Sequence, residues 1–313
     1  MTWFALAPLT LSALAPLTLP AAAPQAGERE WLGRARLFTN DKLGDGQDRW
    51  RTGSYSLSAI RGQSWDGHLP AGLGDLVEYR IRTAIIAPDD LSNPVLGTDR
   101  RYAAAIHFGA ISHFRRGALD IALGLDMVVT GPQTGLGDFQ SWVHGGLGLG
   151  QIQVLGSQIG NALYPTLVAE VSREFVLAAP GGRRTTFRPF LEAQAGVETL
   201  ARIGADFTFG PAGEGDFMVR DVGTGQRSTA MKGNRTRGVT FVLGGDIAYV
   251  ADSAFLPRAS GFGLTPARVR LRGGVLVEEG QRSLFYGLTW LGREFVNQPE
   301  GQVVGSVAIR MRF

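Results

Sequence analysis

Histidine is the side chain best suited to move a proton near neutral pH, and this chain of 313 residues contains four of them. His144 is the most informative, because it lies in a segment, residues 131–161, that is longer than a hairpin connection needs. It follows Gln140 and Trp142 closely along the chain. His144 is therefore a candidate general base, and an incidental loop histidine is the alternative that these residues leave open.

The other three histidines favour structural roles. His107 and His113 fall on the same face of one alternating segment, which indicates a solvated or hydrogen-bonded position on the polar side of a strand. His68 lies in the turn-like run Asp66–Pro70, which favours a surface position.

A second group of candidate residues could hold a hard cation. Asn40 and Asp41 end one alternating segment, Asp45 follows, and Thr52 lies in the next segment. Carboxylate, amide and hydroxyl oxygens are the ligands that calcium prefers. An ordinary turn, in which Asn and Asp side chains bond to their own backbone, remains the alternative.

Composition removes several classes of protein. The chain has no cysteine, which excludes disulfides, thiolate metal sites and a cysteine nucleophile. The G-x-S-x-G signature of a serine nucleophile does not occur. A net charge of +3 is too small for this length to indicate nucleic-acid binding. Beyond the N-terminus no apolar stretch of about 20 residues occurs, which excludes a helical membrane bundle.

Residues 1–26 are uncharged, rich in Ala, Leu and Pro, and end in a run of small residues. This pattern predicts a signal peptide followed by a barrel domain over residues 27–313. A transmembrane anchor is the alternative, but Pro8, Pro16 and Pro20 would interrupt a spanning helix.

The rest of the chain alternates with period two, in segments of about ten residues bounded by turns. In Leu119–Met127 large apolar residues alternate with small or acidic ones, and Arg268, Arg270 and Arg272 form a basic stripe opposite aliphatic residues. Such charges are costly in a dry core but can remain wet or paired inside a barrel. We therefore predict an all-β protein, a 12-stranded antiparallel transmembrane β-barrel. The expected strands are residues 34–40, 51–61, 76–86, 101–114, 117–129, 162–175, 184–197, 199–209, 237–250, 267–278, 282–293 and 302–313.

The last segment supports an outer-membrane location. Val307, Ile309, Met311 and the terminal Phe313 share one face, and a terminal amphipathic strand ending in an aromatic residue resembles the assembly signal of outer-membrane barrels. Two segments break the alternation. Residues 210–235 are expected to form a long polar loop, and residues 131–161 a loop containing a short helix capped by Asp138.

Several short motifs, in order along the chain, resemble the lipid A 3′-O-deacylase family of Gram-negative outer-membrane barrels. Its first-strand Asn-Asp matches Asn40 and Asp41, and its Asp-Arg…Thr-x-Gly matches Asp48, Arg49 and Thr52. The run Gly131–Gly135 followed by Gln140 and His144 resembles the segment that holds the family's catalytic histidine. Gln158 and Asn161, and later Phe187–Pro189, also match at compatible spacing.

The resemblance implies a calcium-dependent ester hydrolase that removes the 3′-linked acyloxyacyl chain of lipid A in the outer leaflet. His144 would be the general base, Asp41 and Asn40 would hold calcium, and Thr52 would help to orient the reacting groups. Gln140 and Arg100 are weaker candidates for substrate contact, and internal pairing is the alternative for Arg100. The expected partner is lipopolysaccharide, and the expected state is a monomer.

Two other functions stay open at this point. A phospholipase would use the same chemistry on glycerophospholipid esters. A small pore or structural barrel would make His144 incidental.

Overall fold

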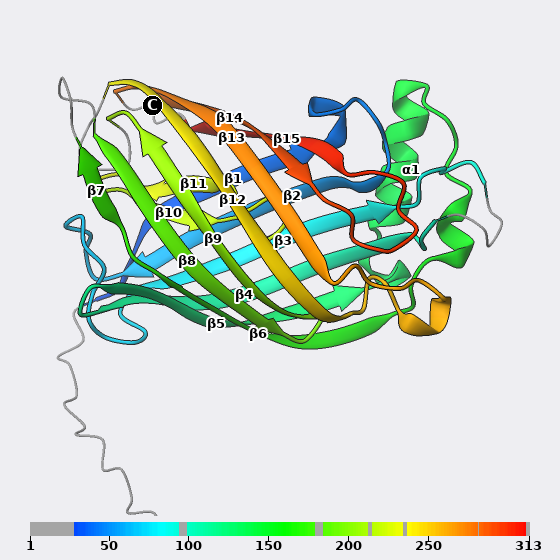
Figure 1. The fold of residues 1–313 in the computed structure, drawn as a ribbon, viewed down its shortest axis with the longest axis horizontal. Coiled ribbons are helices and arrows are strands. Elements are labelled where there is room, and N and C mark those ends of the chain that lie inside the picture. The colour runs from blue at the N-terminus through cyan, green and yellow to red at the C-terminus, as the bar shows by residue number, and fades with distance from the viewer. Residues whose placement is uncertain are drawn as a thin grey trace, which may run out of the picture.

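The computed structural model describes residues 28–93, 99–178, 184–211, 215–233, 237–280 and 282–310. Twelve strands form a closed antiparallel barrel, as predicted (Figure 1). The predicted signal peptide lies outside the described residues. The strands of the wall are β1 (Glu30–Asn40), β2 (Trp50–Gly62), β3 (Val77–Ala87), β4 (Ala103–Arg116), β5 (Leu119–Thr130), β6 (Ala162–Ser172), β8 (Thr185–Ala195), β9 (Glu198–Phe209), β12 (Gly238–Ser253), β13 (Ala267–Glu279), β14 (Arg282–Leu291) and β15 (Gln302–Arg310).

Each strand of the wall pairs with the next wall strand along the chain. A short strand, β7 (Phe175–Ala178), follows β6, and both pair with β8, so they share one position in the wall. The first and last strands close the barrel, where Phe38, Thr39 and Asn40 pair with Val307, Ser306 and Gly305.

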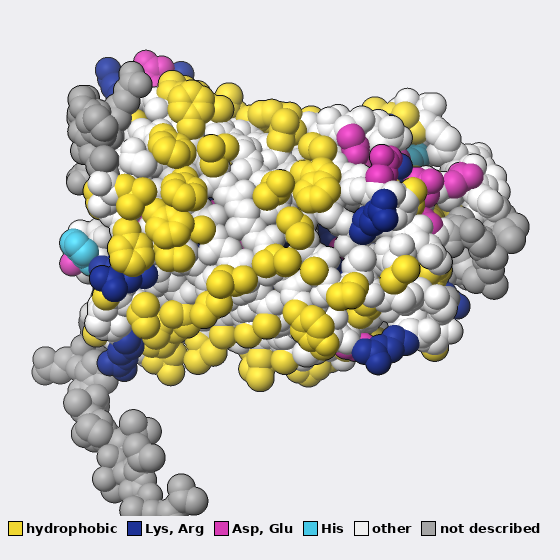
Figure 2. All heavy atoms as spheres, viewed as in Figure 1, with side chains coloured by type: hydrophobic (Ala, Val, Ile, Leu, Met, Phe, Trp, Pro, Cys, Tyr) yellow, Lys and Arg dark blue, Asp and Glu magenta, His cyan; other side chains and the backbone are white. Residues whose placement is uncertain are grey.

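The alternation seen in the sequence separates the two faces of the wall. Leu125 and Leu271 point outward and are 42% and 55% exposed, whereas Asp126 and Arg270 point inward and are 2% and 4% exposed. On the face seen in Figure 2, hydrophobic side chains are spread over much of the outside of the barrel. The outer face therefore suits hydrocarbon, and the charges expected in the lumen are there.

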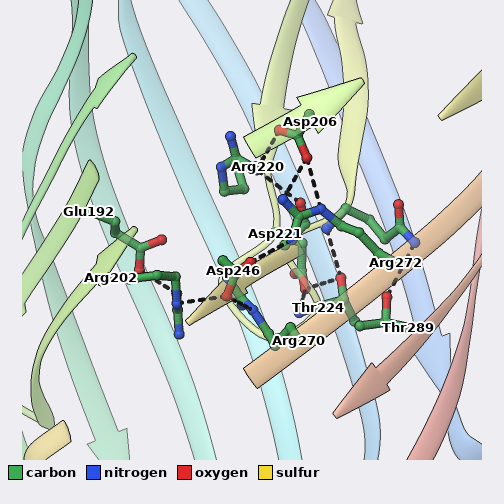
Figure 3. A network of polar contacts seen from close by, with 12 residues as sticks. Glu192, Arg202, Asp206, Arg220, Asp221, Thr224, Asp246, Arg270, Arg272 and Thr289 are labelled. Atoms are coloured by element: carbon green, nitrogen blue, oxygen red, sulfur yellow. Dashed lines mark hydrogen bonds and ion pairs between the residues drawn. The ribbon is translucent and has the colours of Figure 1, made fainter. Parts of the chain in front are cut away.

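Inside the barrel several arginines, among them Arg202, Arg220, Arg270 and Arg272, are paired with carboxylates (Figure 3). Arg272 donates to Asp206 and to Asp246, and Arg270 and Arg202 also contact Asp246. Such a network satisfies each charge without bulk water, which explains why so many charged residues are tolerated at the centre of the wall.

Residues 210–235 are not a simple polar loop. Within them, β10 (Phe217–Arg220) and β11 (Arg227–Met231) form a hairpin that occupies the lumen (Figure 1). Its apolar residues pack on the inner face of β1 and β2 in one cluster with Ala35 and Ile60. Its turn is held by Asp221, which accepts a hydrogen bond from Ser56 and lies 3.7 Å from Arg82. Burial of alternate apolar residues against the wall accounts for the hairpin, which the high glycine content of the segment obscured.

The connections near Asn40 include most of the long ones, which marks this end as extracellular. They carry η1 (Asp41–Leu43), η2 (Pro132–Thr134), α1 (Leu136–Leu147), η3 (Val154–Ser157) and η5 (Arg258–Ser260). The short helix predicted in residues 131–161 is α1, but its N-cap is Gly135, with φ 67°, and Asp138 lies in the first turn. No helix within the described ranges is long and apolar enough to cross a membrane.

Candidate functional site

The segment that contains α1 folds against the outside of the barrel. Tyr102 and Ala104, at the start of β4, are completely buried beneath it. They form one apolar cluster with Val154, and Leu136 and Leu155 pack against that cluster. The outer face of a barrel strand is normally exposed, so burial of these residues shows that the segment containing α1 packs against the wall. This contact brings one face of α1 towards the ends of β1 and β2.

Asp41 lies where β1 ends and is fully buried. Asn40 begins the following 3₁₀ turn, and its side-chain oxygen accepts a hydrogen bond from the backbone N–H of Lys42 at 2.8 Å. Asp41 itself accepts from the backbone N–H of Arg49 at 2.8 Å and lies 3.1 Å from the Thr52 hydroxyl. The Asn-Asp pair thus combines a turn-forming residue with a buried carboxylate.

A bulge at the start of β2 positions Thr52. The register of β2 with β3 shifts between Trp50 and Gly53, and Trp50 has φ 50°, a left-handed conformation that is unusual for a bulky residue. Within the bulge Arg51 pairs with Glu294 in the lumen, while Thr52 lies beside Asp41. The bulge therefore belongs to the backbone geometry in which Arg51 contacts Glu294 while the adjacent Thr52 contacts Asp41.

Asp48 connects these residues to α1. Its Oδ1 lies 2.6 Å from the Thr52 hydroxyl, and its Oδ2 lies 3.0 Å from Nε2 of His144. The other ring nitrogen of His144, Nδ1, lies 2.9 Å from the backbone oxygen of Gly150. The imidazole is 7% exposed and is held on both sides, so its orientation is set by the fold.

Gln140, one turn before His144 on α1, completes the network. Its Nε2 donates to Oδ1 of Asp48 at 3.4 Å, and its Oε1 accepts from the Tyr102 hydroxyl at 2.9 Å. Burial raises the pKa of Tyr102, so this hydroxyl keeps its proton and remains a donor. Residues from β1, β2, β4 and α1 are thereby joined through one set of polar contacts.

The network contains more acceptors than donors. The Thr52 hydroxyl has one hydrogen, yet carboxylate oxygens of both Asp41 and Asp48 lie within bonding distance. Burial, together with the negative charges of Asp48 and Asp45, raises the pKa of the Asp41 carboxyl to about 7, although hydrogen bonds from Arg49 and Thr52 lower it. Among the described residues no Lys, Arg or His side chain pairs with Asp41. An oxygen-binding cation would relieve this excess of negative charge.

The oxygen cluster around Asp41 contains few charged ligands for a cation. Across the described ranges, no group of three or more His, Cys, Asp or Glu side chains is placed to hold a metal ion. Two carboxylates and neutral oxygens would have to do so, and neutral oxygens are common ligands of calcium.

The structure thus brings together Asp41, Thr52, Gln140 and His144, with Asn40 adjacent. It does not bring Arg100 to them, because Arg100 is fully buried and its guanidinium donates to Glu294 and to the backbone oxygen of Phe255. Asp48 and Tyr102 were not singled out as site residues. Asp48 lay within a matched motif, but nothing in the sequence indicated Tyr102, whose place depends on how α1 packs.

A family model described as "Outer membrane protein LpxR" matches residues 9–313. The chain belongs to the LpxR family. The resemblance to lipid A 3′-O-deacylases is thereby confirmed, and the chain is an integral outer-membrane barrel that acts on lipid A. The comparison with curated proteins found no match.

Among solved structures, "LpxR from Salmonella typhimurium" matches with a TM-score of 0.74 at 18% identity, covering 90% of this chain and 100% of that one. At this identity the match shows a shared fold. The NanC porin matches with a TM-score of 0.39 at 6% identity, covering 90% of this chain and 100% of that one. The LpxR fold thus extends over nearly the whole chain.

Proposed function

We propose that this protein hydrolyses the ester that joins the 3′-linked acyloxyacyl chain to lipid A, with His144 as general base. The observation that carries the proposal is the continuous contact from Asp41 through Thr52 and Asp48 to His144. A carboxylate-rich oxygen cluster beside a positioned imidazole is the set of groups that water-mediated ester hydrolysis needs.

The contacts of His144 define which nitrogen can act. A backbone oxygen only accepts, so Nδ1 carries the hydrogen that is donated to Gly150. Nε2 faces a carboxylate oxygen of Asp48, so a proton lies between the two groups in this arrangement. Nε2 becomes a base once that proton has passed to solvent and Asp48 no longer occupies it. It can then take a proton from a water molecule as this water attacks the ester carbonyl. The proton is returned to the sugar oxygen when the ester carbon–oxygen bond breaks, which releases the acyl chain as a carboxylic acid.

Calcium is the cofactor we propose, held by Asp41 and Asp48 with oxygens of Thr52 and Asn40. When bound, it would stabilise the negative charge that develops on the ester carbonyl oxygen. Asp48 contacts both Thr52 and His144, so it links the oxygen cluster to the base. A ligand that draws Asp48 towards Asp41 would leave Nε2 of His144 available.

The position of the site suits a lipid substrate. It lies between the outer face of the wall and α1, and several large apolar side chains nearby in sequence are exposed. Phe139 and Trp142 on α1 are 55% and 74% exposed, and Leu163 at the start of β6 is 58% exposed. Acyl chains could stay in apolar surroundings while the sugar and ester reach the polar cluster.

The test is the lipid A mass spectrum of cells that express His144→Gln. We expect the barrel to assemble and release of the 3′-linked chain to fall by about 10²-fold or more, the usual contribution of a general base. His68→Gln is the matched control, because His68 is exposed at the other end of the barrel. Full activity of the His144 variant would remove the mechanism.

Lipid analysis and a conductance measurement on the same variants separate the alternatives. Loss of acyl chains from glycerophospholipids, with lipid A intact, would identify a phospholipase instead. Ion conductance that is unaffected by the His144 substitution, without any change in lipids, would indicate a pore.

A further inference from the structure

Two arginines lie directly opposite each other in the lumenal hairpin. Arg220 is the last residue of β10 and Arg227 is the first residue of β11, and the two are paired in register beside the turn. Residues paired in this way point to the same face of a hairpin, and like charges in such a pair repel each other. Val219 points to the other face and packs against β1 and β2. The arginine pair therefore needs negative charge on the face that is turned away from those strands.

The wall supplies that negative charge to Arg220 but not to Arg227. The guanidinium of Arg220 donates to Glu170 at 2.8 Å and to Asp206 at 2.9 Å, and the contact with Asp206 is drawn in Figure 3. Arg227 makes no hydrogen bond or ion pair with any residue that the structure describes. Its five N–H groups are thus without an acceptor among these residues.

The charges around Arg227 do not compensate for its own. The strongest of them belongs to another arginine, Arg188 on β8, and the next belongs to Asp206. Asp206 already accepts hydrogen bonds from Arg220 and from Arg272. The guanidinium of Arg227 is therefore a cation whose nearest acidic neighbour is bonded to two other arginines.

Arg188, Arg220 and Arg227 all line one cavity of about 710 Å³ in the lumen. A volume of this size is typical of pockets that hold small molecules. The cavity extends to the periplasmic turn between β2 and β3, where Trp65 and His68 line it. A ligand of this cavity would therefore come from the periplasmic side.

Gln194 on β8 adds a neutral polar group that also lacks a partner. Its side chain is 7% exposed, lines the same cavity and has no hydrogen bond to any residue within the described ranges. Buried amides are normally hydrogen-bonded. The cavity thus presents two groups that its described side chains leave unbonded, one a cation and one an amide.

We propose that this cavity binds the phosphate group of a soluble molecule from the periplasm. The phosphate oxygens would accept from Arg227 and from Arg188, because arginine forms strong, charge-assisted hydrogen bonds with phosphate. A divalent anion would also offset the repulsion between Arg220 and Arg227. If the ligand is a phosphate ester, the rest of it would lie further into the cavity, where Gln194 would bond to it. The site is inside the lumen and does not depend on the proposed hydrolysis.

Isothermal titration calorimetry on the purified barrel in detergent tests the proposal, with inorganic phosphate and glucose 1-phosphate as the probes. We expect Arg227→Gln to weaken phosphate binding by about tenfold or more, the loss expected when charge-assisted hydrogen bonds are removed. Arg116→Gln is the matched control, because Arg116 is an exposed arginine at the end of β4 outside the cavity and should bind as the wild type does.

Thermal unfolding without phosphate separates a ligand site from a structural role. Arg227→Gln removes one of two like charges and breaks no bond to the described residues, so the variant should be at least as stable as the wild type. A large loss of stability would show that Arg227 supports the fold and would overturn the proposal.

The two probes distinguish the source of the phosphate. For an ester, Gln194→Leu should weaken the binding of glucose 1-phosphate and leave that of inorganic phosphate unchanged. Inorganic phosphate that binds at least as tightly as glucose 1-phosphate would support the site with free phosphate as its ligand. The proposal is overturned if neither probe binds, if Arg227→Gln binds as the wild type does, or if glucose binds as tightly as glucose 1-phosphate.

Discussion

Nε2 of His144 lies 3.0 Å from Oδ2 of Asp48, which joins the helix outside the barrel to the turn between the first two strands. Asp48 is also within hydrogen-bonding distance of Thr52, which in turn contacts the buried Asp41. The orientation of the imidazole and the charge of the oxygen cluster are therefore coupled through one carboxylate.

Substituting Asp48 by Asn should impair catalysis more than folding. The amide can still bond to Thr52 and His144, but it lacks the negative charge that supports the cation and the imidazolium. We expect activity on lipid A to fall by roughly 10²-fold and calcium affinity to fall with it, as for other lost metal-supporting contacts. Activity assays at increasing calcium concentration would show this. Unchanged calcium dependence would exclude Asp48 from the cation site.

Calcium should stabilise the protein more at pH 8 than at pH 5.5. The folded Asp41 carboxyl keeps its proton up to about pH 7, whereas the unfolded chain releases it near pH 3.8. The contribution of Asp41 to the free energy of unfolding therefore falls as pH rises from about 3.8 to 7 and stays low above that. At a pH at which Asp41 is ionised, a bound cation would restore this contribution to the free energy of unfolding. Thermal unfolding with calcium or chelator, for the wild type and Asp41→Asn, measures this, and a shift that persists in the variant would contradict it.

Replacing Tyr102 by Phe should loosen α1 without removing the base. The Tyr102 hydroxyl donates to Gln140 in a buried place, and its loss leaves that amide oxygen without this partner. We expect a loss of about 1–3 kcal/mol in local stability. Limited proteolysis of residues 131–161 should become faster, while the rest of the barrel stays resistant. Tyr164→Phe on β6 is the control, because it makes the same substitution outside the cluster beneath α1.

The wild-type barrel should conduct ions poorly. The hairpin β10–β11 lies in the lumen, and its turn is bonded to two strands of the wall, to Ser56 on β2 and to Thr289 on β14. Removing residues 217–231 should raise conductance in planar bilayers, because those contacts and the buried apolar cluster would be lost. Equal conductance of both proteins would show that another part of the lumen controls ion passage.

The regular wall was predictable because a strand exposes alternate residues to two different surroundings. Leu125 faces outward and Asp126 faces the lumen, so the two surroundings are visible in the sequence as an alternation of apolar and charged residues. The same logic failed for residues 210–235, where the two short strands face other protein on both sides. Their apolar residues were too few and too widely interrupted by glycine to show a period.

For the site, the motifs identified His144, Asp41 and Thr52, because each lies in a short run with a characteristic order of residue types. The role of Asp48 between His144 and Thr52 was decided only by the tertiary structure, since it depends on the packing of α1 against the wall. Local alternation specifies a strand and its two faces, but contacts between distant segments depend on strand ends, bulges and packed insertions, which only the folded chain determines.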